Sequence, residues 1–269
     1  ATLAAAVQGC QLVIHSAAAL HGNLAAQSAV NRDGTYALAS AAVAAGVQRF
    51  VHVSTISVYG YRNTSDVTET TPPAPGYDPY PASKLAAERA LQQVAAATGL
   101  AYSILRPGMI YGARSGMWTG QMFTLARRRP TVFIGDGRGS CYPIHVDDVV
   151  DLTLTLATHP AALGEIFNAT PDPSPTWRDF LGAYAALAGH QQWLGIPPAL
   201  LTPIAALAGR FAPKDSPLCD LPDLLPFSQR YISYKMTKAA TLVGWQPRVP
   251  LADGIAGCAD WVRSVGLLA

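Results

Sequence analysis

A tyrosine and a lysine stand four residues apart at the start of a helix-forming stretch. The pair is Tyr80 and Lys84, and the run Leu-Ala-Ala-Glu-Arg-Ala-Leu follows at 85–91. Residues four apart share one face of a helix, and an ammonium group beside a phenol favours the phenolate. We therefore expect Lys84 to lower the pKa of Tyr80 from about 10, so that the phenol exchanges a proton with an alcohol or carbonyl oxygen near neutral pH. The same spacing also occurs on ordinary helix surfaces, and the surrounding residues must distinguish the two interpretations.

The elements that must position this pair form an alternating pattern in the first two-thirds of the chain. Apolar strand patterns alternate with helical patterns, which predicts βαβ units and a parallel sheet. The predicted strands are 12–15, 49–54 and 101–105, and the predicted helices are 29–45 and 80–98. A loop rich in Thr and Pro, 63–79, leads to Tyr80.

The pattern is looser beyond Gly112, and these elements would form a smaller, mixed part of the molecule. Thr176 and Asp179 have the spacing of a capping box at the start of a helix. The other predicted elements are a helix at 118–129, a strand at 131–134, a helix to residue 158 that Asp147 or Asp148 caps, a strand at 164–168 and a helix at 251–265.

The composition excludes several classes of function. Of the 269 residues, 50% are hydrophobic and 13% charged, so one large α/β domain, or a domain with a small appendage, has ample material for a core. The net charge of +2 comes from scattered basic residues, which argues against a nucleic-acid partner. The one basic cluster, 127–129, ends a predicted helix, where cations offset the helix dipole.

The spacing of cysteines and histidines argues against a metal site. Cys10, Cys141, Cys219 and Cys258 lie far apart without a Cys-x-x-Cys pair, and the six histidines show no metal-ligand spacing. Such cysteines indicate a reducing compartment. Because the start of the sequence does not read as a signal peptide, we expect a cytoplasmic location.

No apolar run in the sequence is long and clean enough to span a bilayer. The closest run, 193–211, is interrupted by Pro197, Pro198 and Pro203. It suits the wall of a pocket for an apolar substrate or a loose interfacial helix, and a pair of core helices is the alternative interpretation.

Six short motifs follow one another in a fixed order. They are His-Ser-Ala-Ala at 15–18, Asn-Arg-Asp-Gly-Thr at 31–35, Val-Ser-Thr-Ile-Ser-Val-Tyr-Gly at 53–60, Tyr-x-x-x-Lys at 80–84, Arg-Pro-Gly-Met-Ile-Tyr-Gly at 106–112 and His-Val-Asp-Asp at 145–148. In this order the chain resembles the extended short-chain dehydrogenase/reductases of the NAD-dependent epimerase/dehydratase family, over nearly its whole length.

The resemblance implies an α/β fold with a Rossmann-like doubly wound parallel sheet and a small mixed C-terminal substrate-binding subdomain. Residues 1–112 would belong to the dinucleotide-binding domain. Residues 113–269 would be mostly substrate-binding, with segments at about 131–168 returning to the Rossmann core.

The resemblance also implies roles for matching positions. Tyr80 would be the general acid/base, and Lys84 would lower its pKa and hold the nicotinamide ribose of NAD or NADP. The hydroxyl of Thr55 would hydrogen-bond the reacting oxygen, with Ser54 as the rival for that role and as a cofactor-side position. One hydroxyl would position the oxygen, the phenol would move the proton, and the nicotinamide would take the hydride.

Further cofactor-side positions follow from the same resemblance. Ala17 and Ala18 would allow close approach of the dinucleotide, or would serve packing alone. Pro107 and Ile110 would wall the nicotinamide, or would form a rigid turn. Asn31 would lie near the active site against the cofactor-side strands, and a helix N-cap is its other, compatible interpretation.

One family feature has no counterpart in the sequence. Family members begin with a strand and a Gly-x-x-Gly-x-x-Gly turn that brings the backbone to the pyrophosphate at a helix N-terminus. This sequence begins without Met, and roughly sixty family residues would precede it, from the usual size of a βαβαβ half. We therefore expect an N-terminally truncated Rossmann domain that binds dinucleotide poorly by itself, and the function expected is that of the parent protein.

Three departures from the family pattern bear on the substrate. Family dehydratases place Asp-Glu where this chain has Ile56-Ser57, which argues against a sugar 4,6-dehydratase. Sugar-nucleotide epimerases commonly carry a substrate-binding Asn at the position of Met109 and a phosphate-gripping Arg at that of Cys141. With the apolar run 193–211, these departures favour an oxidoreductase that interconverts a secondary alcohol and a ketone on an apolar, sterol- or terpenoid-like substrate.

Two other functions stay open. The tail 233–247 resembles that of the 3-beta-hydroxysteroid dehydrogenase-like branch, but a sugar-nucleotide epimerase is the alternative enzyme. A non-catalytic NAD(P)-sensing binding protein is the alternative of another class. The expected partners are a small-molecule substrate and a second copy of the chain, in a homodimer that would pair the Ala-rich helices 29–45 and 80–98.

Overall fold

A four-stranded parallel sheet organises the first part of the molecule. The computed structural model describes residues 2–60, 66–76, 78–211, 225–226 and 228–268. The strand order is β1-β2-β3-β7, and each neighbouring pair is parallel. The strands are β1 (Leu12–His15), β2 (Arg49–Val53), β3 (Tyr102–Pro107) and β7 (Ile166–Ala169). This confirms the α/β fold with a parallel sheet that the alternating pattern predicts.

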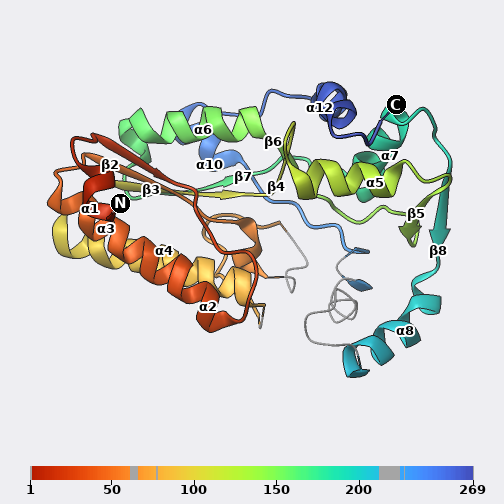
Figure 1. Cartoon of the computed structure of the whole chain (residues 1–269), viewed down its shortest axis with the longest axis horizontal. Coiled ribbons are helices and arrows are strands. Elements are labelled where there is room, and N and C mark those ends of the chain that lie inside the picture. The colour runs from red at the N-terminus through yellow and green to blue at the C-terminus, as the bar shows by residue number, and fades with distance from the viewer. Residues whose placement is uncertain (1, 61–65, 77, 212–224, 227, 269) are drawn as a thin grey trace.

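Helices cover both faces of this sheet and make a three-layered unit (Figure 1). On one face, Phe50 and Ile104 pack against the helices α1, α3 and α4, and on the other Val51 and Leu105 pack against α6 and α10. Successive side chains of a strand point to opposite faces, so β2 is buried along almost its whole length. The helices of this unit are α1 (Leu3–Val7), α2 (Leu24–Ser28), α3 (Gly34–Ala44), α4 (Pro79–Thr98), α6 (Val146–Thr158) and α10 (Thr237–Val243), with the short helical turns η1 (Ala29–Asp33), η2 (Ile56–Tyr59) and η4 (Pro160–Ala162).

The remaining elements form a smaller lobe beside the sheet, on the right of Figure 1. Its core is an apolar cluster that includes Phe123, Phe180 and Tyr184. Strand β4 pairs with β6 and β5 pairs with β8, both in parallel. The elements are β4 (Met109–Tyr111), η3 (Gly116–Gln121), α5 (Met122–Ala126), β5 (Thr131–Ile134), β6 (Pro143–His145), α7 (Trp177–Leu187), β8 (Trp193–Ile196), α8 (Pro198–Phe211), α11 (Leu251–Ala256) and α12 (Ala259–Ser264). Of the range 131–168, α6 and β7 lie on the main sheet, and β5 lies in this lobe.

Three helices differ from the sequence-based expectation. The helix expected at 29–45 begins earlier, at Leu24, and passes through the π-helical turn η1 before α3. The helix expected at 118–129 is the π-helical segment η3 followed by α5, and the one expected at 251–265 is interrupted between α11 and α12. A π turn adds one residue to the helical ladder, and apolar periodicity does not register such an insertion.

The helix caps give one confirmed and one wrong prediction. The capping box is confirmed, because Thr176 Oγ1 accepts from the backbone N–H of Asp179 at 3.1 Å and Asp179 accepts from that of Thr176 at 2.8 Å. Helix α6, however, is capped by His145, whose Nδ1 accepts from the backbone N–H of Asp147 at 3.3 Å, and not by Asp147 or Asp148. A neutral imidazole nitrogen is an acceptor and can replace the expected carboxylate.

The apolar run 193–211 does not form a pair of core helices. It folds as β8 followed by α8, and both carry exposed apolar side chains. Among the residues that the structure describes, no helix has the length and apolar character needed to cross a membrane.

Candidate active site

The sheet brings most of the predicted site residues to one edge. Ala17 and Ala18 follow β1, Ser54 and Thr55 follow β2, and Pro107 ends β3. Because β1, β2 and β3 are parallel neighbours, their carboxyl ends lie side by side. Ligands of open α/β sheets bind at such carboxyl ends.

Helix α4 brings Tyr80 and Lys84 to the same edge. Asp78 caps the helix by accepting the backbone N–H of Tyr80 at 3.0 Å, and Pro79 takes the first helical position, where its missing N–H costs nothing. Gly99 ends the helix in the left-handed conformation at φ 76°. Leu85 then packs α4 against η2, the turn that follows Thr55.

Lys84 is tied to the end of β2. Its Nζ donates to the carbonyl oxygen of Val53 at 2.6 Å and lies 3.5 Å from Nε2 of His52. The side chain is 2% exposed. Burial lowers the pKa of the amine to about 8, and the carboxylate of Glu88 opposes that shift. The amine is therefore poised between its charged and neutral forms in mildly alkaline solution.

Tyr80 does not have the lowered pKa that the spacing predicts. Burial of the phenol raises its pKa, and the nearby carboxylate of Asp78 raises it further. The expectation that Lys84 lowers this pKa is thus wrong for the structure described, where the amine is directed at the Val53 carbonyl. Among the described residues the Tyr80 hydroxyl has no hydrogen-bond partner, so it is available to a substrate oxygen.

The two hydroxyls after β2 have different surroundings. Ser54 is 3% exposed, and its hydroxyl donates to the carboxylate of Glu88 at 2.5 Å. Thr55 is half-buried, and its Oγ1 accepts from the backbone N–H of Ser57 at 3.2 Å and lies 3.0 Å from the Ser57 hydroxyl. The Ser54 hydroxyl is therefore committed to an internal network, whereas Thr55 sits at the edge where a ligand could reach it.

A buried ion pair lies behind these hydroxyls. Arg106 donates from Nε and Nη2 to the two carboxylate oxygens of Glu88, at 2.9 and 2.6 Å, and each side chain is 2% exposed. In the sequence, Glu88 is one residue of the helix-forming run 85–91. Two features of the sequence could have revealed the pair: Arg106 stands at the end of an apolar strand, and Glu88 follows Lys84 by four residues, on the same helix face. A charge buried in such a place needs a partner of opposite charge.

Two buried histidines lie beneath Lys84 and were also missed. His15 and His52 are register partners on β1 and β2, with ring centroids 5.2 Å apart. Burial and, secondarily, the charge of Lys84 lower the pKa of His15 to about 4, and the same causes, with the neighbouring His15, hold that of His52 well below its usual range. His15 Nε2 lies 2.9 Å from the Thr35 hydroxyl. Both rings are therefore neutral at physiological pH.

Asn31 joins the β1 edge to helix α4. Its side-chain oxygen accepts from the backbone N–H of Ala19 at 2.7 Å, and its amide donates to the carbonyl of Ala19 at 3.0 Å and to the hydroxyl of Ser83 at 2.9 Å. Ser83 stands between Tyr80 and Lys84. The N-cap interpretation is wrong, because Asn31 lies inside the π-helical turn η1. The side chain instead fixes the segment after Ala17 and Ala18 against helix α4.

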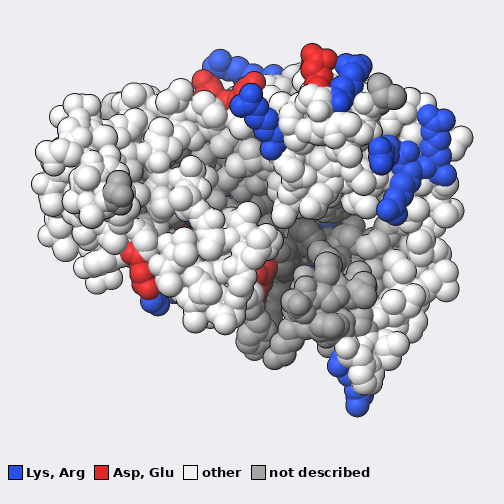
Figure 2. Space-filling view, viewed as in Figure 1, with Lys and Arg blue, Asp and Glu red and all other residues white. Residues whose placement is uncertain are grey.

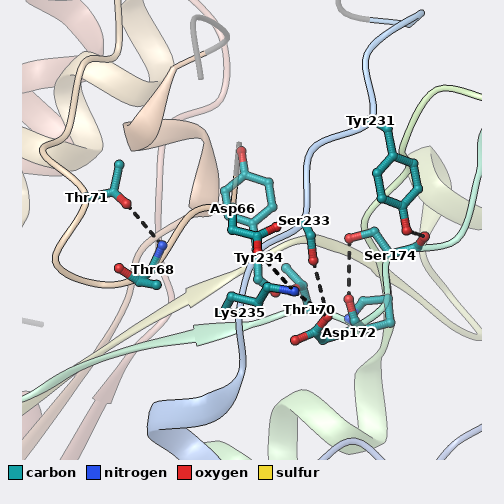
Figure 3. Close-up of polar contacts among 11 residues, drawn as sticks. Asp66, Thr68, Thr71, Thr170, Asp172, Ser174, Tyr231, Ser233, Tyr234 and Lys235 are labelled. Carbon is teal, nitrogen blue, oxygen red and sulfur yellow. Dashed lines mark hydrogen bonds and ion pairs between the residues drawn. The ribbon is translucent and has the colours of Figure 1, made fainter. Parts of the chain in front are cut away.

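The C-terminal part of the chain is attached to the loop that leads to Tyr80. Figure 3 shows Lys235 between the carboxylates of Asp66 and Asp172, at 3.5 and 3.4 Å. Beside it Ser233 donates to Asp172 at 3.2 Å, and Val67 forms an isolated parallel bridge with Tyr234. This attachment places the segment 231–236 against the elements that carry Thr55 and Tyr80.

The remaining predicted positions lie next to the apolar cores. Pro107 is buried at the end of β3, and Ile110, on β4, is half-buried against the core under the main sheet. Met109 is half-buried against the core of the smaller lobe, and Cys141 is fully buried within that core. Burial raises the pKa of the Cys141 thiol well above its usual range.

The similarity of the chain to known proteins shows its family. Residues 1–170 match the NAD dependent epimerase/dehydratase family. The chain belongs to this family. It is an extended short-chain dehydrogenase/reductase, as the six motifs predict, and the family consists of NAD(P)-dependent enzymes.

Two relatives and one solved structure illustrate the breadth of the similarity. The chain is 31% identical to a UDP-glucose 4-epimerase of Mycolicibacterium smegmatis, over 87% of this chain and 69% of that protein. It is 28% identical to the 3beta-hydroxysteroid-dehydrogenase/decarboxylase isoform 1 of Arabidopsis thaliana, over 94% of this chain and 62% of that protein, so it spans less than two-thirds of the plant enzyme's length. Its fold is similar to that of a UDP-glucuronic acid 4-epimerase from Bacillus cereus in complex with NAD, with a TM-score of 0.77 at 22% identity over 99% and 77% of the two chains.

The residues at the sheet edge fit the dinucleotide that the family uses. Ala17 is exposed and Ala18 half-buried, so no long side chain of these two positions covers the backbone after β1. Lys84 presents a donor at the end of the adjacent strand, and the Nδ1 of buried His52 has no partner among the described residues. Lys84 would hold the ribose hydroxyls, and Ala17 and Ala18 would face the dinucleotide.

Proposed function

We propose that this protein is an NAD(P)-dependent oxidoreductase that interconverts a secondary alcohol and a ketone on an apolar, sterol- or terpenoid-like substrate. The observation that carries the substrate class is Cys141. By the family resemblance, sugar-nucleotide epimerases commonly carry an arginine for phosphate at this position, and here the side chain is fully buried in an apolar cluster. Met109, at the second polar position of those epimerases, also packs against that cluster. Neither residue can offer the charge or the amide that a sugar nucleotide requires.

The side chains at the sheet edge support a simple division of labour. The substrate oxygen would accept hydrogen bonds from Thr55 and from Tyr80, whose hydroxyl has no other described partner. Tyr80 gives its proton to the oxygen in the reductive direction and takes it back in the oxidative direction. When bound, NAD(P)H supplies the hydride. Lys84, held by the carbonyl of Val53 at the same edge, would hold the ribose of the cofactor.

Replacement of Tyr80 by Phe tests this mechanism. In the full-length protein, we expect Tyr80→Phe to lower the rate of hydride transfer by roughly 10²- to 10⁴-fold, followed by NAD(P)H absorbance over a panel of alcohols and ketones. Tyr36→Phe, an exposed tyrosine on α3, is the matched control and should leave the rate unchanged. Unchanged turnover in Tyr80→Phe would remove the phenol from the mechanism.

A sugar-nucleotide epimerase is the second candidate, and the 31% identity to the mycobacterial UDP-glucose 4-epimerase favours it. Thermal unfolding with and without UDP-glucose separates the two candidates. A ligand at a hundred times its Kd stabilises a protein by about 2.7 kcal/mol, which is several degrees in Tm. A clear shift with UDP-glucose would favour the epimerase, and no shift is expected for the proposed oxidoreductase.

The third candidate, a cofactor-sensing protein without turnover, would bind NAD(P) and show no activity over the whole alcohol and ketone panel. The presence of Tyr80, Thr55 and Lys84 at one edge supports the enzyme instead. The wide spacing of the four cysteines supports the proposed cytoplasmic location. The homodimer through α3 and α4 stays a prediction, and sedimentation analysis would test it.

A further inference from the structure

Helix α8 carries its largest apolar side chains on the side that faces away from the protein. Leu200, Ile204, Leu207 and Phe211 recur every three or four residues and therefore share one face of the helix. Their exposed fractions are 63%, 55%, 62% and 69%. Ala205 is only 3% exposed, so the helix packs on the protein through a small side chain and presents these large ones outward. These four exposed residues are called the α8 stripe below.

The exposed apolar surface continues from α8 into the small sheet next to it. Strand β8 leads directly into α8, and its Trp193 and Leu194 are 47% and 52% exposed. Val132 of β5, the register partner of Leu194, is 48% exposed. The guanidinium of Arg178 lies 3.5 Å from the centre of the Trp193 ring. Large exposed apolar surface bordered by polar groups marks a site of interaction with a protein or a membrane.

The charges of the surrounding elements select between these two partners. The sequence has no Asp or Glu in 89–135 or in 180–214, two ranges that contain η3, α5, β5, β8 and α8. The arginines 127–129 follow α5, and Arg210 lies in the last turn of α8. On the face shown in Figure 2, blue side chains lie over this part of the molecule, on its right side and at its lower tip. The red side chains on that face lie over other elements. Among the described residues of these elements the charged side chains are therefore basic, and the exposed Asp136, two residues beyond β5, is paired with Arg138.

From this arrangement we infer that the α8 stripe docks the smaller lobe on an anionic phospholipid bilayer. An apolar helix face enters the boundary between head groups and acyl chains, and basic side chains at its border pair with the phosphates. A second copy of the chain fits less well, because it would bring the same basic surface against itself. The inference concerns the α8 stripe and does not depend on which reaction the protein catalyses.

Vesicle sedimentation with the purified chain tests the inference. We expect binding to vesicles of phosphatidylcholine mixed with phosphatidylglycerol, and weaker binding to vesicles of phosphatidylcholine alone or at high salt. Arg210→Gln should weaken binding to the mixed vesicles by about fivefold, since each basic residue near an anionic surface contributes about 1 kcal/mol. Salt-independent binding, or no binding to the mixed vesicles, would contradict the inference.

Polar substitutions in the α8 stripe provide the second arm. The double variant Ile204→Ser, Leu207→Ser should bind the mixed vesicles at least about tenfold more weakly, because two buried apolar side chains are lost from the interface. The matched control is Val150→Ser, Leu154→Ser on α6, whose side chains are 50% and 52% exposed and which should bind like the unchanged protein.

The same variants also test whether a second copy of the chain covers this surface instead. Circular dichroism should show that both double variants stay folded, since exposed positions tolerate substitution. Sedimentation velocity without lipid should show the same oligomeric state for the unchanged chain and the α8 variant. A dimer that the α8 variant dissociates would assign this surface to a second copy and overturn the inference, as would equal vesicle binding by the α8 and α6 variants.

Discussion

The Nζ of Lys84 donates a 2.6 Å hydrogen bond to the carbonyl oxygen of Val53, the last residue of β2. One side chain of α4 is thereby fixed to the end of the strand that leads into Thr55. The bond also explains why Lys84 tolerates burial, since at least one of its three donors is satisfied by the backbone. Helix α4 and the end of β2 are thus held together by this buried amine.

Stability should therefore change with pH through Lys84. Burial lowers the pKa of the folded-state amine to about 8, while in the unfolded chain it is close to 10.5. Between these values the unfolded chain binds more protons, so the free energy of unfolding should rise as the pH rises from 8 to 10.5, by up to about 3 kcal/mol. Urea unfolding of the chain and of Lys84→Met measures this as the difference between the two pH dependences, and identical dependences would contradict the burial argument.

The pH profile of catalysis should respond to Asp78, which raises the pKa of Tyr80 after the larger effect of burial. Asp78→Asn removes the charge but keeps a side chain that can cap α4. We expect the limb of the rate profile that reports Tyr80 to move to lower pH, because a charge that raises the pKa of the phenol is removed. Asp136→Asn, on an exposed turn of the other lobe, should leave the profile in place. A limb that moves to higher pH, or does not move, would disagree with the assignment.

Substitution of Thr55 should change activity, whereas substitution of Ser54 should change stability. Thr55→Ala should lower kcat by roughly 10²-fold, the effect of removing one donor to the reacting oxygen, and Thr55→Ser should restore most of it. Ser54→Ala should instead lower the free energy of unfolding by about 1–3 kcal/mol, because it leaves the buried Glu88 carboxylate without one hydrogen bond. Steady-state kinetics and urea unfolding of all three variants check both outcomes. The reverse pattern would give the catalytic hydroxyl to Ser54.

Breaking the buried pair of Glu88 and Arg106 should be severe. Glu88→Ala leaves a guanidinium buried without its carboxylate, and the expected loss is about 3–5 kcal/mol of unfolding free energy. The double variant Glu88→Leu, Arg106→Leu should recover much of that loss, since neither charge is left alone. Asp33→Ala, in an exposed pair, should have no measurable effect on urea unfolding. A mild effect of Glu88→Ala would mean that water reaches the pair.

Asn31 should control the opening of the segment after β1. Asn31→Leu removes both hydrogen bonds to Ala19, so we expect hydrogen exchange of the Ala19 amide to accelerate roughly 5- to 150-fold, the equivalent of about 1–3 kcal/mol. Exchange measured by NMR reports this residue directly. Asn23→Ala is the control, because Asn23 caps α2 nearby and has no contact with Ala19 among its described hydrogen bonds. Equal exchange in the two variants would show that Asn31 does not hold the segment.

The sequence was sufficient where the signal is local. Strands β1, β2 and β3 are apolar runs, and Tyr80 and Lys84 stand four residues apart on one helix, so the fold and the placement of this pair on α4 could be predicted. The pKa of Tyr80 could not, because burial is a tertiary property and outweighs the expected influence of Lys84. Burial and Asp78 both raise the pKa of the phenol, whereas the spacing predicts that Lys84 lowers it.

Contacts between residues distant in the sequence could not be predicted either. Glu88 finds Arg106 on a neighbouring strand, and Lys84 finds His52 on another. Each residue alone is compatible with an exposed surface, and only the packing of α4 on the sheet shows that it is buried. The π-helical turn that directs Asn31 to Ala19 and Ser83 has no composition signal at all.

The path of the chain between the sheet and the smaller lobe limits how such a protein can be recombined. After leaving the sheet at β4, the chain returns to it at α6 and β7, leaves again for α7 and α8, and returns once more at α10. A single splice near residue 112 would thus graft a foreign β7 and two foreign helices onto the sheet along with the new lobe. Exchanging substrate preference between relatives therefore requires transplanting separate inserts, with the returning elements kept from the recipient.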